Sequence, residues 1–511
     1  MSFADDILVY RQGKDRQAMA ANVQEELHRL EQWCDQHNGK IHPDKASVLW
    51  CSLNNRAVKT DMPELAIKWQ VIQREQSLKY LGITFDRTLS AKDHISSVVT
   101  RARRGLTAMK VMAAASMPQK TLFLLYQALV LSVIEYGFGT LTLSQSQLKR
   151  LEVIQNEAMR TILGCTRDTS AEAMRHILDL FTMEERHKLA QIKEYMRVAG
   201  DTEHPLHPKL EQGHQSRLKR GSSWLRQAAR IIAQFGNTED IRRGQEWCEV
   251  EDTYTAFTNV VATLGRECRE QPAAATNAEI ETLIEELSRP GDVIIFTDGS
   301  VKRKIQSGWA FSARADGRIV QERCGAYALT TSSMVMEVTA ITEALKWLEQ
   351  ETYRHAVFVT DSMSTLTKIQ KAELHTDWIR SIERSRLQKL TWLFCPGHAG
   401  VRGNERADRL AGSATIGETL TLDRATVLSL AKQHIEDGRT QEPSHTLQTI
   451  QTKGIARGAG RKSDLRGTSR RVYNQLLVET VSRQTLMWTI QRRGEQLWSC
   501  DLCDEPISGP K

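Results

Sequence analysis

Four acidic residues and one histidine in the second half of the chain have types and spacing that could hold metal ions. Asp298 follows the apolar run 293–296 and precedes a glycine, a pattern typical of a buried strand that ends at a site. Asp361 closes a similar apolar run at 356–359. Two neighbouring parallel strands of this kind would bring both carboxylates to one edge of a sheet. The sequence therefore predicts a pair of acidic groups at strand ends.

Two further acidic residues are expected on helices. Glu337 shares one predicted helix face with Ile341 and Leu348, so its carboxylate would lie on an apolar face and need a partner. Asp408 lies on a second predicted helix. His398 precedes that helix in a loop with glycines on both sides, which could place an imidazole over the site.

Together these residue types suit a pair of Mg²⁺ ions acting on a phosphodiester. Mg²⁺ prefers oxygen ligands and keeps several waters, so two ions need several carboxylates and the scissile phosphate itself. One ion would activate the attacking water, and the other would stabilise the leaving oxygen. The structural alternative for each acidic residue is a helix cap, an ion pair or a solvated group. Four such residues together favour a two-metal site, in which Mn²⁺ could replace Mg²⁺.

The sequence around these five residues resembles a type 1 ribonuclease H domain. The segments that carry the resemblance are Thr297-Asp298-Gly299-Ser300, the apolar helix around Glu337, Thr360-Asp361-Ser362, and the run PGHAGVRGNERAD from Pro396 to Asp408. The last segment is long and specific. The resemblance implies an α/β ribonuclease H-like domain over residues 291–415, with a mixed five-stranded sheet and flanking helices.

The same resemblance implies a reaction and a role for each residue. The family cleaves the RNA strand of an RNA–DNA hybrid and leaves 5′-phosphate and 3′-hydroxyl ends. By resemblance, two Mg²⁺ ions would be held by four carboxylates, and His398 would assist product release or proton transfer. The four carboxylates are those of Asp298, Glu337, Asp361 and Asp408. The expected partner is therefore nucleic acid, in the form of an RNA–DNA hybrid.

The amino-terminal part resembles a piece of a non-LTR retrotransposon reverse transcriptase. Residues 3–6 are similar to its aromatic-x-Asp-Asp motif, although an Asp-Asp pair in a turn is commonly only a turn. Later palm and primer-grip motifs resemble residues 33–35, 39–45 and 79–86, in their usual order. A polymerase site also needs an aspartate from an earlier strand and fingers that hold the template. We therefore expect residues 1–89 to be a truncated palm remnant without DNA synthesis, with Asp5 and Asp6 left over from its metal site.

The middle of the chain is predicted to be mainly helical. Residues 90–200 show helical periodicity, as in Leu148, Leu151 and Ile162, and resemble the thumb of the same polymerases. Residues 201–290 carry weaker signals and are assigned as a helical connector. The fold class expected for the whole chain is thus an α/β ribonuclease H-like domain preceded by a truncated palm and a mainly helical thumb and connector.

The positive charge of the chain is clustered. The formal net charge is +7 and the isoelectric point is near 8.9, a modest surplus that suits a polyanionic partner. Basic clusters lie at residues 101–104, 217–220 and 453–471, and phosphate contact is their natural function. The alternative for the last cluster, which contains interleaved glycines, is a solvated linker. Residues 416–511 are therefore predicted to form a basic, partly disordered tail.

A pair of cysteines in this tail has the spacing that zinc uses. Cys500 and Cys503 resemble the start of a zinc knuckle, but zinc takes four ligands and no His or Cys follows Cys503 in the sequence. Only a distant pair such as His434 and His445 could complete the site. The prediction is an incomplete zinc knuckle.

Cysteine use and hydropathy bear on the cellular compartment. Nine scattered cysteines and no signal segment indicate a reducing, intracellular setting in the cytoplasm or nucleus. The apolar segment 122–134 is shorter than the roughly 18 to 20 residues that a membrane span needs, so it is expected to be a buried helix. No membrane partner is expected, and no oligomeric state is predicted.

Three functions of different kinds are compatible with these patterns. The leading one is an RNA–DNA hybrid ribonuclease within a truncated retrotransposon reverse transcriptase, favoured by the complete set of five site residues. The second is a catalytically idle relic that binds nucleic acid in a salt-dependent manner without cleaving it. The third is an inert product that folds poorly, because palm strands at 3–10 and 80–85 would leave exposed edges.

Overall fold

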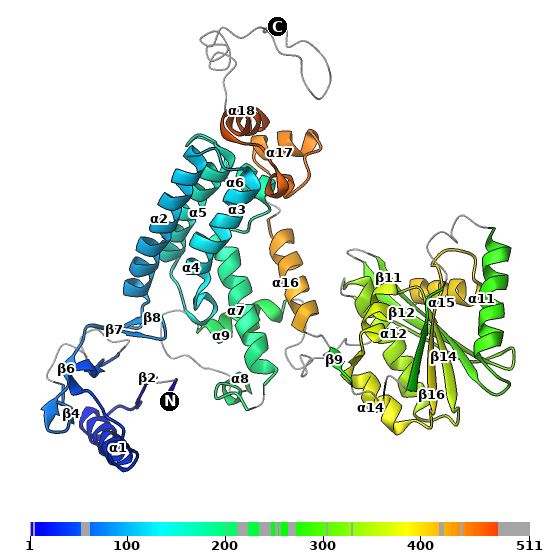
Figure 1. Cartoon of the computed structure of the whole chain (residues 1–511), viewed down its shortest axis with the longest axis horizontal. Coiled ribbons are helices and arrows are strands. Elements are labelled where there is room, and N and C mark those ends of the chain that lie inside the picture. The colour runs from blue at the N-terminus through cyan, green and yellow to red at the C-terminus, as the bar shows by residue number, and fades with distance from the viewer. Residues whose placement is uncertain are drawn as a thin grey trace, which may run out of the picture. The chain divides into compact units, whose positions relative to one another are not determined.

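The structure of the chain is a computed structural model that divides into two compact units. One unit comprises Met1–Ala190 together with Thr440–Lys511, and the other comprises Gln191–Arg439 (Figure 1). The described residues are 2–3, 6–52, 62–201, 203–211, 223–234, 247–250, 254, 257–263, 272–302, 305–328, 331–417, 424–439 and 443–478. The first unit is therefore discontinuous in sequence, because the second unit is inserted between its two parts.

Among its described residues, the amino-terminal part of the first unit contains a long α-helix, the short 3-10 helix η1 (Pro43–Lys45) and short strands that pair two by two. The first pair is antiparallel, with Phe3 opposite Asp6. Asp5 lies outside the described residues, and the palm assignment stays a prediction. The elements are β1 (Ser2–Phe3), β2 (Asp6–Ile7), α1 (Arg16–Gln36), β3 (Ser47–Val48), β4 (Ala66–Ile67), β5 (Gln70–Val71), β6 (Gln73–Arg74), β7 (Ser77–Tyr80) and β8 (Ile83–Asp86).

A helical bundle follows, as the apolar periodicity predicts. Its central helix α5 begins at a capping box made by Ser144 and Gln147, and it ends at Gly164, whose φ of 73° is the left-handed conformation that glycine adopts without strain. The buried residues Leu151 and Ile162 lie on its core face. The helices are α2 (Lys92–Ala114), α3 (Gln119–Tyr126), the π-helical turn η2 (Gln127–Leu131), α4 (Ser132–Glu135), η3 (Phe138–Thr140), α5 (Gln145–Leu163), α6 (Ala171–Leu178) and α7 (Met183–Ala199).

One segment of this bundle, Gln119–Thr140, is long and apolar enough to cross a membrane by length and composition alone. In the structure it packs inside the bundle, where Leu122, Tyr126 and Val130 are fully buried. Of the most apolar window of this segment, 44% is buried inside the protein, and its exposed apolar residues include Leu124 and Leu129.

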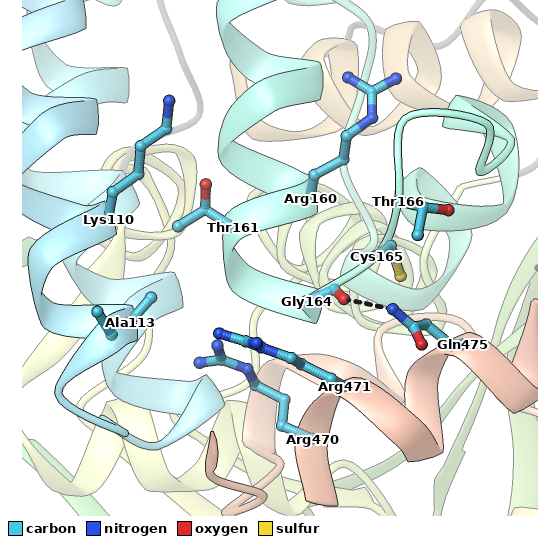
Figure 2. Close-up of a pocket in the computed structure, with 11 residues that line it drawn as sticks. Lys110, Ala113, Arg160, Thr161, Gly164, Cys165, Thr166, Arg470, Arg471 and Gln475 are labelled. Atoms are coloured by element: carbon cyan, nitrogen blue, oxygen red, sulfur yellow. Dashed lines mark hydrogen bonds between the residues drawn. The ribbon is translucent and has the colours of Figure 1, made fainter. Parts of the chain in front are cut away.

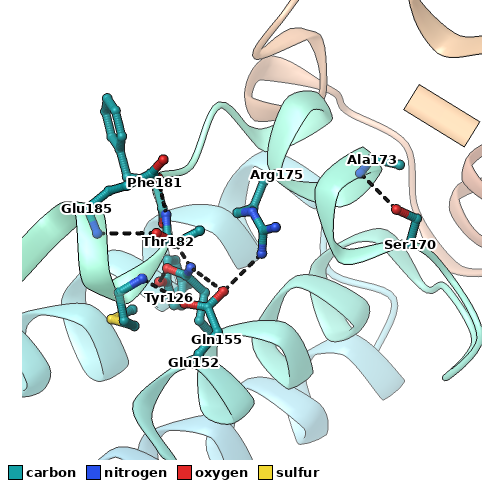
Figure 3. Close-up of polar contacts among 10 residues, drawn as sticks. Tyr126, Glu152, Gln155, Ser170, Ala173, Arg175, Phe181, Thr182 and Glu185 are labelled. Carbon is teal, nitrogen blue, oxygen red and sulfur yellow. Dashed lines mark hydrogen bonds and ion pairs between the residues drawn. The ribbon is translucent and has the colours of Figure 1, made fainter. Parts of the chain in front are cut away.

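A buried polar network ties the bundle helices together (Figure 3). The hydroxyl of Tyr126 donates to Oε1 of Gln155 at 2.7 Å, and the amide of Gln155 donates to the carbonyl of Phe181 at 2.9 Å. The carboxylate of Glu152 pairs with Arg175 at 3.0 Å and accepts the backbone N–H of Met183 at 2.6 Å. The start of α7 and the helices α5 and α6 are thereby fixed relative to one another.

The basic segment after residue 443 is not a solvated linker where it is described. It folds into α17 (His445–Thr452), η6 (Ala459–Lys462) and α18 (Gly467–Leu477), which pack on the bundle (Figure 1). Ile450 and Val478 are buried in the bundle core, at 0% and 2% exposure. The amide of Asn474 donates to the carbonyl of Leu163 at 2.9 Å and to Oε1 of Gln119 at 2.8 Å. The linker interpretation is wrong for this stretch, because specific polar and apolar contacts fix it.

The second unit is built on a mixed sheet with helices on both faces. The strand order is β10-β16-β14-β11-β12-β13. The strands β10, β16, β14 and β11 are parallel to one another, β12 is antiparallel to β11, and β13 is antiparallel to β12. The strands are β10 (Thr258–Val261), β11 (Val293–Lys302), β12 (Gln306–Ala315), β13 (Arg318–Tyr327), β14 (His355–Thr360) and β16 (Lys389–Phe394). The helices are α11 (Ala273–Leu287), α12 (Ser333–Leu348), α13 (Met363–Gln370), α14 (Thr376–Arg384) and α15 (Arg402–Ser413).

Alternate residues of the parallel strands point to opposite faces of this sheet. Ile295 and Phe358 belong to the core under α12, α13 and α14, whereas Ile294 and Val357 belong to the core under α11 and α15. Strands that are apolar on both faces are expected in a sheet covered by two helical layers. The apolar runs seen in the sequence therefore have a direct structural cause.

The sheet differs from the prediction in having six strands. The additional strand β10 comes from the predicted helical connector and pairs in parallel with β16, with Val260 facing Trp392. A second connector strand, β9 (Trp247–Glu249), pairs with β15 (Glu373–His375). The rest of the described connector and the residues after the sheet form α8 (Pro208–Glu211), α9 (Trp224–Ile232) and α16 (Arg424–Asp437). Part of the connector is extended because the edge of β16 offers backbone partners.

Candidate active site

The parallel strands β11 and β14 bring Asp298 and Asp361 together at one edge of the sheet. Their parallel pairing ends with Thr297 opposite Thr360, and each aspartate is the next residue along the chain, Asp298 still within β11 and Asp361 just after β14. Asp298 is not at a strand end, however. β11 continues to Lys302 along its antiparallel neighbour β12, which keeps the backbone around Asp298 hydrogen-bonded on that side.

Glu337 reaches the same place from helix α12. The backbone N–H of Gly299 donates to its Oε1 atom at 2.9 Å. A side chain at position 299 would bring its Cβ within 2.5 Å of the Glu337 nitrogen and 2.8 Å of Met336, so glycine allows α12 to pack directly on β11. Ser332 caps the start of this helix, because its hydroxyl accepts the N–H of Val335 at 3.3 Å.

These three residues form a compact acidic triad. One carboxylate oxygen from each of Asp298, Glu337 and Asp361 lies within 4.8 Å of the others. Asp298 is 6% exposed and Glu337 is 5% exposed. The triad is therefore a set of like charges largely removed from water.

Burial and mutual repulsion raise the pKa values of this triad. The pKa of Asp298 rises to about 7 because of burial, and then because of the charges of Asp361, Asp408 and Glu405. The pKa of Glu337 is raised well above its usual value by burial and by Asp298 and Asp361. The Oε2 atom of Glu337 is buried and has no hydrogen-bond partner within the described residues. A bound cation would remove both the repulsion and this unsatisfied acceptor.

A second group lies on and before helix α15. His398, Glu405 and Asp408 each offer one ligand atom within 4.8 Å of the others, and Nδ1 of His398 is 3.8 Å from Oδ2 of Asp408. The His398 side chain is 79% exposed, and its backbone has a φ of 54°. The structure thus holds the five predicted residues as two neighbouring groups, and the charges of Asp408 and Glu405 act on Asp298.

The loop that carries His398 is held from two sides. Gly397 passes so close to Asp361 that a Cβ there would collide with the carboxylate. On the other side, Oδ1 of Asn277 accepts the backbone N–H of Arg402 at 2.9 Å, which satisfies a free donor in the first turn of α15. The backbone of α11 also packs against Gly400, where a Cβ would collide with Ala273. α11 therefore positions the loop.

Two of these residues were missed as functional by the sequence analysis. Glu405 was named only as part of the run from Pro396 to Asp408. Its position three residues before Asp408 places both side chains on one helix face, and this spacing could have indicated it. Asn277 carries no signal in its own sequence context, because its role depends on a contact 125 positions away.

The other predicted sites are not joined to this one. The candidate metal groups found in the described part of the chain are the two above, and neither includes Asp6. Cys500 and Cys503 lie outside the described residues, so the zinc knuckle stays a prediction, as does the role of Asp5 and Asp6. Both clusters of acidic residues suit divalent cations that prefer oxygen ligands. The strongest indication is the buried Oε2 atom of Glu337, which has no hydrogen-bond partner among the described residues.

The domain that carries these residues is similar in sequence to a known family. Residues 290–416 match the RNase H family. A ribonuclease H of Erythrobacter litoralis is 33% identical over 138 residues, which cover 24% of this chain and 94% of that protein. The chain belongs to the ribonuclease H family. A ribonuclease H of Hyphomonas neptunium is 30% identical and is covered to 90%.

This ribonuclease H domain is also related to those of non-LTR retrotransposon reverse transcriptases. The polymerase of the mobile element jockey from Drosophila melanogaster is 27% identical over 169 residues, and that of transposon BS is 26% identical over 188 residues. The alignments cover 32% and 36% of this chain and 18% and 20% of those proteins, so the chain matches about a fifth of their length. Among solved structures, LC11-RNase H1 in complex with an RNA/DNA hybrid is 18% identical, with a TM-score of 0.21 and coverage of 24% of this chain and 95% of that one.

Proposed function

We propose that the ribonuclease H domain hydrolyses the RNA strand of an RNA–DNA hybrid with the help of two Mg²⁺ ions. The observation that carries the proposal is the buried triad of Asp298, Glu337 and Asp361, whose charges repel one another and whose inner oxygen on Glu337 has no hydrogen-bond partner among the described residues. Buried charges of one sign are costly unless an opposite charge joins them. Family membership and the carboxylate chemistry both support a divalent cation in that role.

Each residue then has a distinct task. Mg²⁺, when bound, would activate the attacking water and stabilise the leaving oxygen. Asp298, Glu337 and Asp361 would hold one part of the site at the sheet edge, and Asp408 would hold the other part from α15. His398 is exposed and lies 3.8 Å from Asp408, and in this proposal it would move a proton at the leaving oxygen or assist product release.

The test is cleavage of a labelled RNA strand annealed to DNA, measured with the full chain in Mg²⁺ and in chelator. Asp298→Asn keeps the side-chain volume and removes the charge, so we expect cleavage to fall by at least about 10²-fold, the scale of losing a group that stabilises transition-state charge. His398→Ala should slow turnover less, since this residue assists and does not hold the ions.

The matched control is Asp377→Asn on α14, an aspartate paired at the surface with Arg380 at 3.4 Å. It removes the same charge from the same domain and should cleave like the parent. Parent-like cleavage by Asp298→Asn would refute the site. Retained hybrid binding without any cleavage by the parent would instead identify a relic that binds nucleic acid without cutting it.

A further inference from the structure

A basic pocket lies in the helical unit, whereas the residues discussed so far as catalytic belong to the other unit. It has a volume of about 370 Å³ and is lined by α2, the end of α5 and α18 (Figure 2). Four cationic side chains line it, and none of its lining residues is an aspartate or glutamate. The four cations are Lys110, Arg160, Arg470 and Arg471.

Three of these cations lack an opposite charge. Arg160, Arg470 and Arg471 form no ion pair within the described part of the chain, whereas Lys110 is paired with Glu157. Arg470 is only 1% exposed and donates from Nη1 to the carbonyl of Met117 at 3.3 Å, with its Nε left without an acceptor. A buried guanidinium without a counter-charge is costly, so the pocket is built for an anion.

Capping of α5 does not account for this concentration of charge. Two carbonyls at the end of α5 already accept neutral amides. The carbonyl of Leu163 accepts Asn474 at 2.9 Å. The carbonyl of the capping Gly164 accepts Gln475 at 3.1 Å (Figure 2). The carboxyl end of a helix carries roughly half a negative charge, which is far less than three unpaired arginines. The stem of Arg471 lies directly over Gly164, where a Cβ would be 2.6 Å from its Cγ, so this arginine is held at the pocket.

We propose that this pocket binds a backbone phosphate of a nucleic-acid strand. Arginine is the side chain best matched to phosphate oxygens. The cationic surface also continues beyond the pocket, because Arg103 lies seven residues before Lys110 on the same face of α2 and is exposed. A row of cations suits a strand with repeated phosphates better than a single small anion. The proposal does not depend on cleavage by the ribonuclease H domain.

The test compares binding of a labelled RNA–DNA hybrid and an all-DNA duplex to the full chain in EDTA, over a series of salt concentrations. The variants are Arg471→Gln and the double variant Arg160→Gln, Arg471→Gln. Each lost phosphate contact should lower the slope of log affinity against log salt by about 1, and the double variant should bind about tenfold more weakly at moderate salt. Because both duplexes share the phosphodiester backbone, the loss should be equal for both.

The matched control is Lys149→Gln, which removes one exposed charge from the other end of α5. It should keep the affinity and salt slope of the parent to within about twofold. The proposal is overturned if Arg471→Gln and the double variant, both folded by circular dichroism, bind like the parent, or if Lys149→Gln binds as weakly as Arg471→Gln. Protection of the parent against heat by inorganic phosphate, with unchanged duplex binding by the variants, would assign the pocket to a small anion and also overturn it.

Discussion

At the scale of single residues, the site is a compromise between burial and charge. Asp298 and Glu337 lie where burial and neighbouring acidic groups disfavour their charged forms, and the divalent cations proposed above would offset this cost. Residue types and spacing were enough to single out five residues that the structure gathers into two groups, because each follows an apolar run, lies in an apolar helix or belongs to a long specific motif. The pairing of Glu405 with Asp408 and His398 required the geometry of α15.

The raised pKa of Asp298 predicts how stability depends on pH without metal. An aspartate in the unfolded chain titrates near 3.9, and that of Asp298 in the folded protein titrates at about 7. Between these values the folded form keeps a proton that the unfolded form releases. The free energy of unfolding of the second unit should therefore fall as pH rises from about 4 to about 7.

Thermal unfolding in chelator across this pH range is the measurement. Mg²⁺ should restore stability at pH 7 and above, since it favours the ionised triad. Asp298→Asn has no such titration, so its melting temperature should fall less steeply, with Glu337 responsible for what remains of the slope. A melting temperature of the parent that rises steadily from pH 4 to 7 in chelator would contradict the assignment.

At the scale of elements, the sequence was informative where an element is determined locally. β11 and β14 contain the apolar runs 293–296 and 356–359, and α5 has both its capping box and its terminal glycine, so each could be predicted from its own residues. β10 has only four residues and exists because β16 offers it an edge. The apolar pattern of α18 is weak, and its position depends on the side chain of Asn474. Such elements depend on tertiary partners that local patterns do not contain.

Helix α11 lies before residue 290, where the match to the ribonuclease H family begins, yet we expect it to stabilise the domain. It buries Ile280 and Ile284 against the sheet, at 0% and 3% exposure, and Asn277 holds the start of α15. A fragment of residues 285–417 should therefore be less stable than one of residues 247–417. The two isoleucines alone contribute about 3 to 6 kcal/mol.

Urea unfolding of the two fragments measures this difference. Asn277→Ala in the full chain provides the matched local test: it leaves the backbone N–H of Arg402 without its acceptor and should lower cleavage while hardly changing global stability. Equal unfolding midpoints for the two fragments would show that α11 does not stabilise the domain.

At the scale of the whole molecule, the ribonuclease H unit is an insertion in a discontinuous helical unit. The part after residue 443 returns to the bundle that precedes the insertion, and Ile450 and Val478 complete its core. Ending the chain at residue 442 should thus destabilise a part of the protein that lies more than 250 positions earlier in sequence. Loss of the two buried apolar side chains costs about 3 to 6 kcal/mol, and loss of Asn474 leaves the buried amide of Gln119 and the carbonyl of Leu163 without that partner.

Hydrogen exchange of the full chain and of the chain ending at 442 separates the two units. Protection should fall in α5 and α6 and stay unchanged in β11 and β14, because the inserted unit keeps its own core. Asn474→Ala in the full chain should produce a smaller loss confined to the helical unit, about 1 to 3 kcal/mol from buried polar groups left unsatisfied. Unchanged protection of α5 after truncation would mean that the bundle is stable without the segment after residue 443. The helix that carries Arg471 and lines the basic pocket would then contribute nothing to the stability of the helical unit.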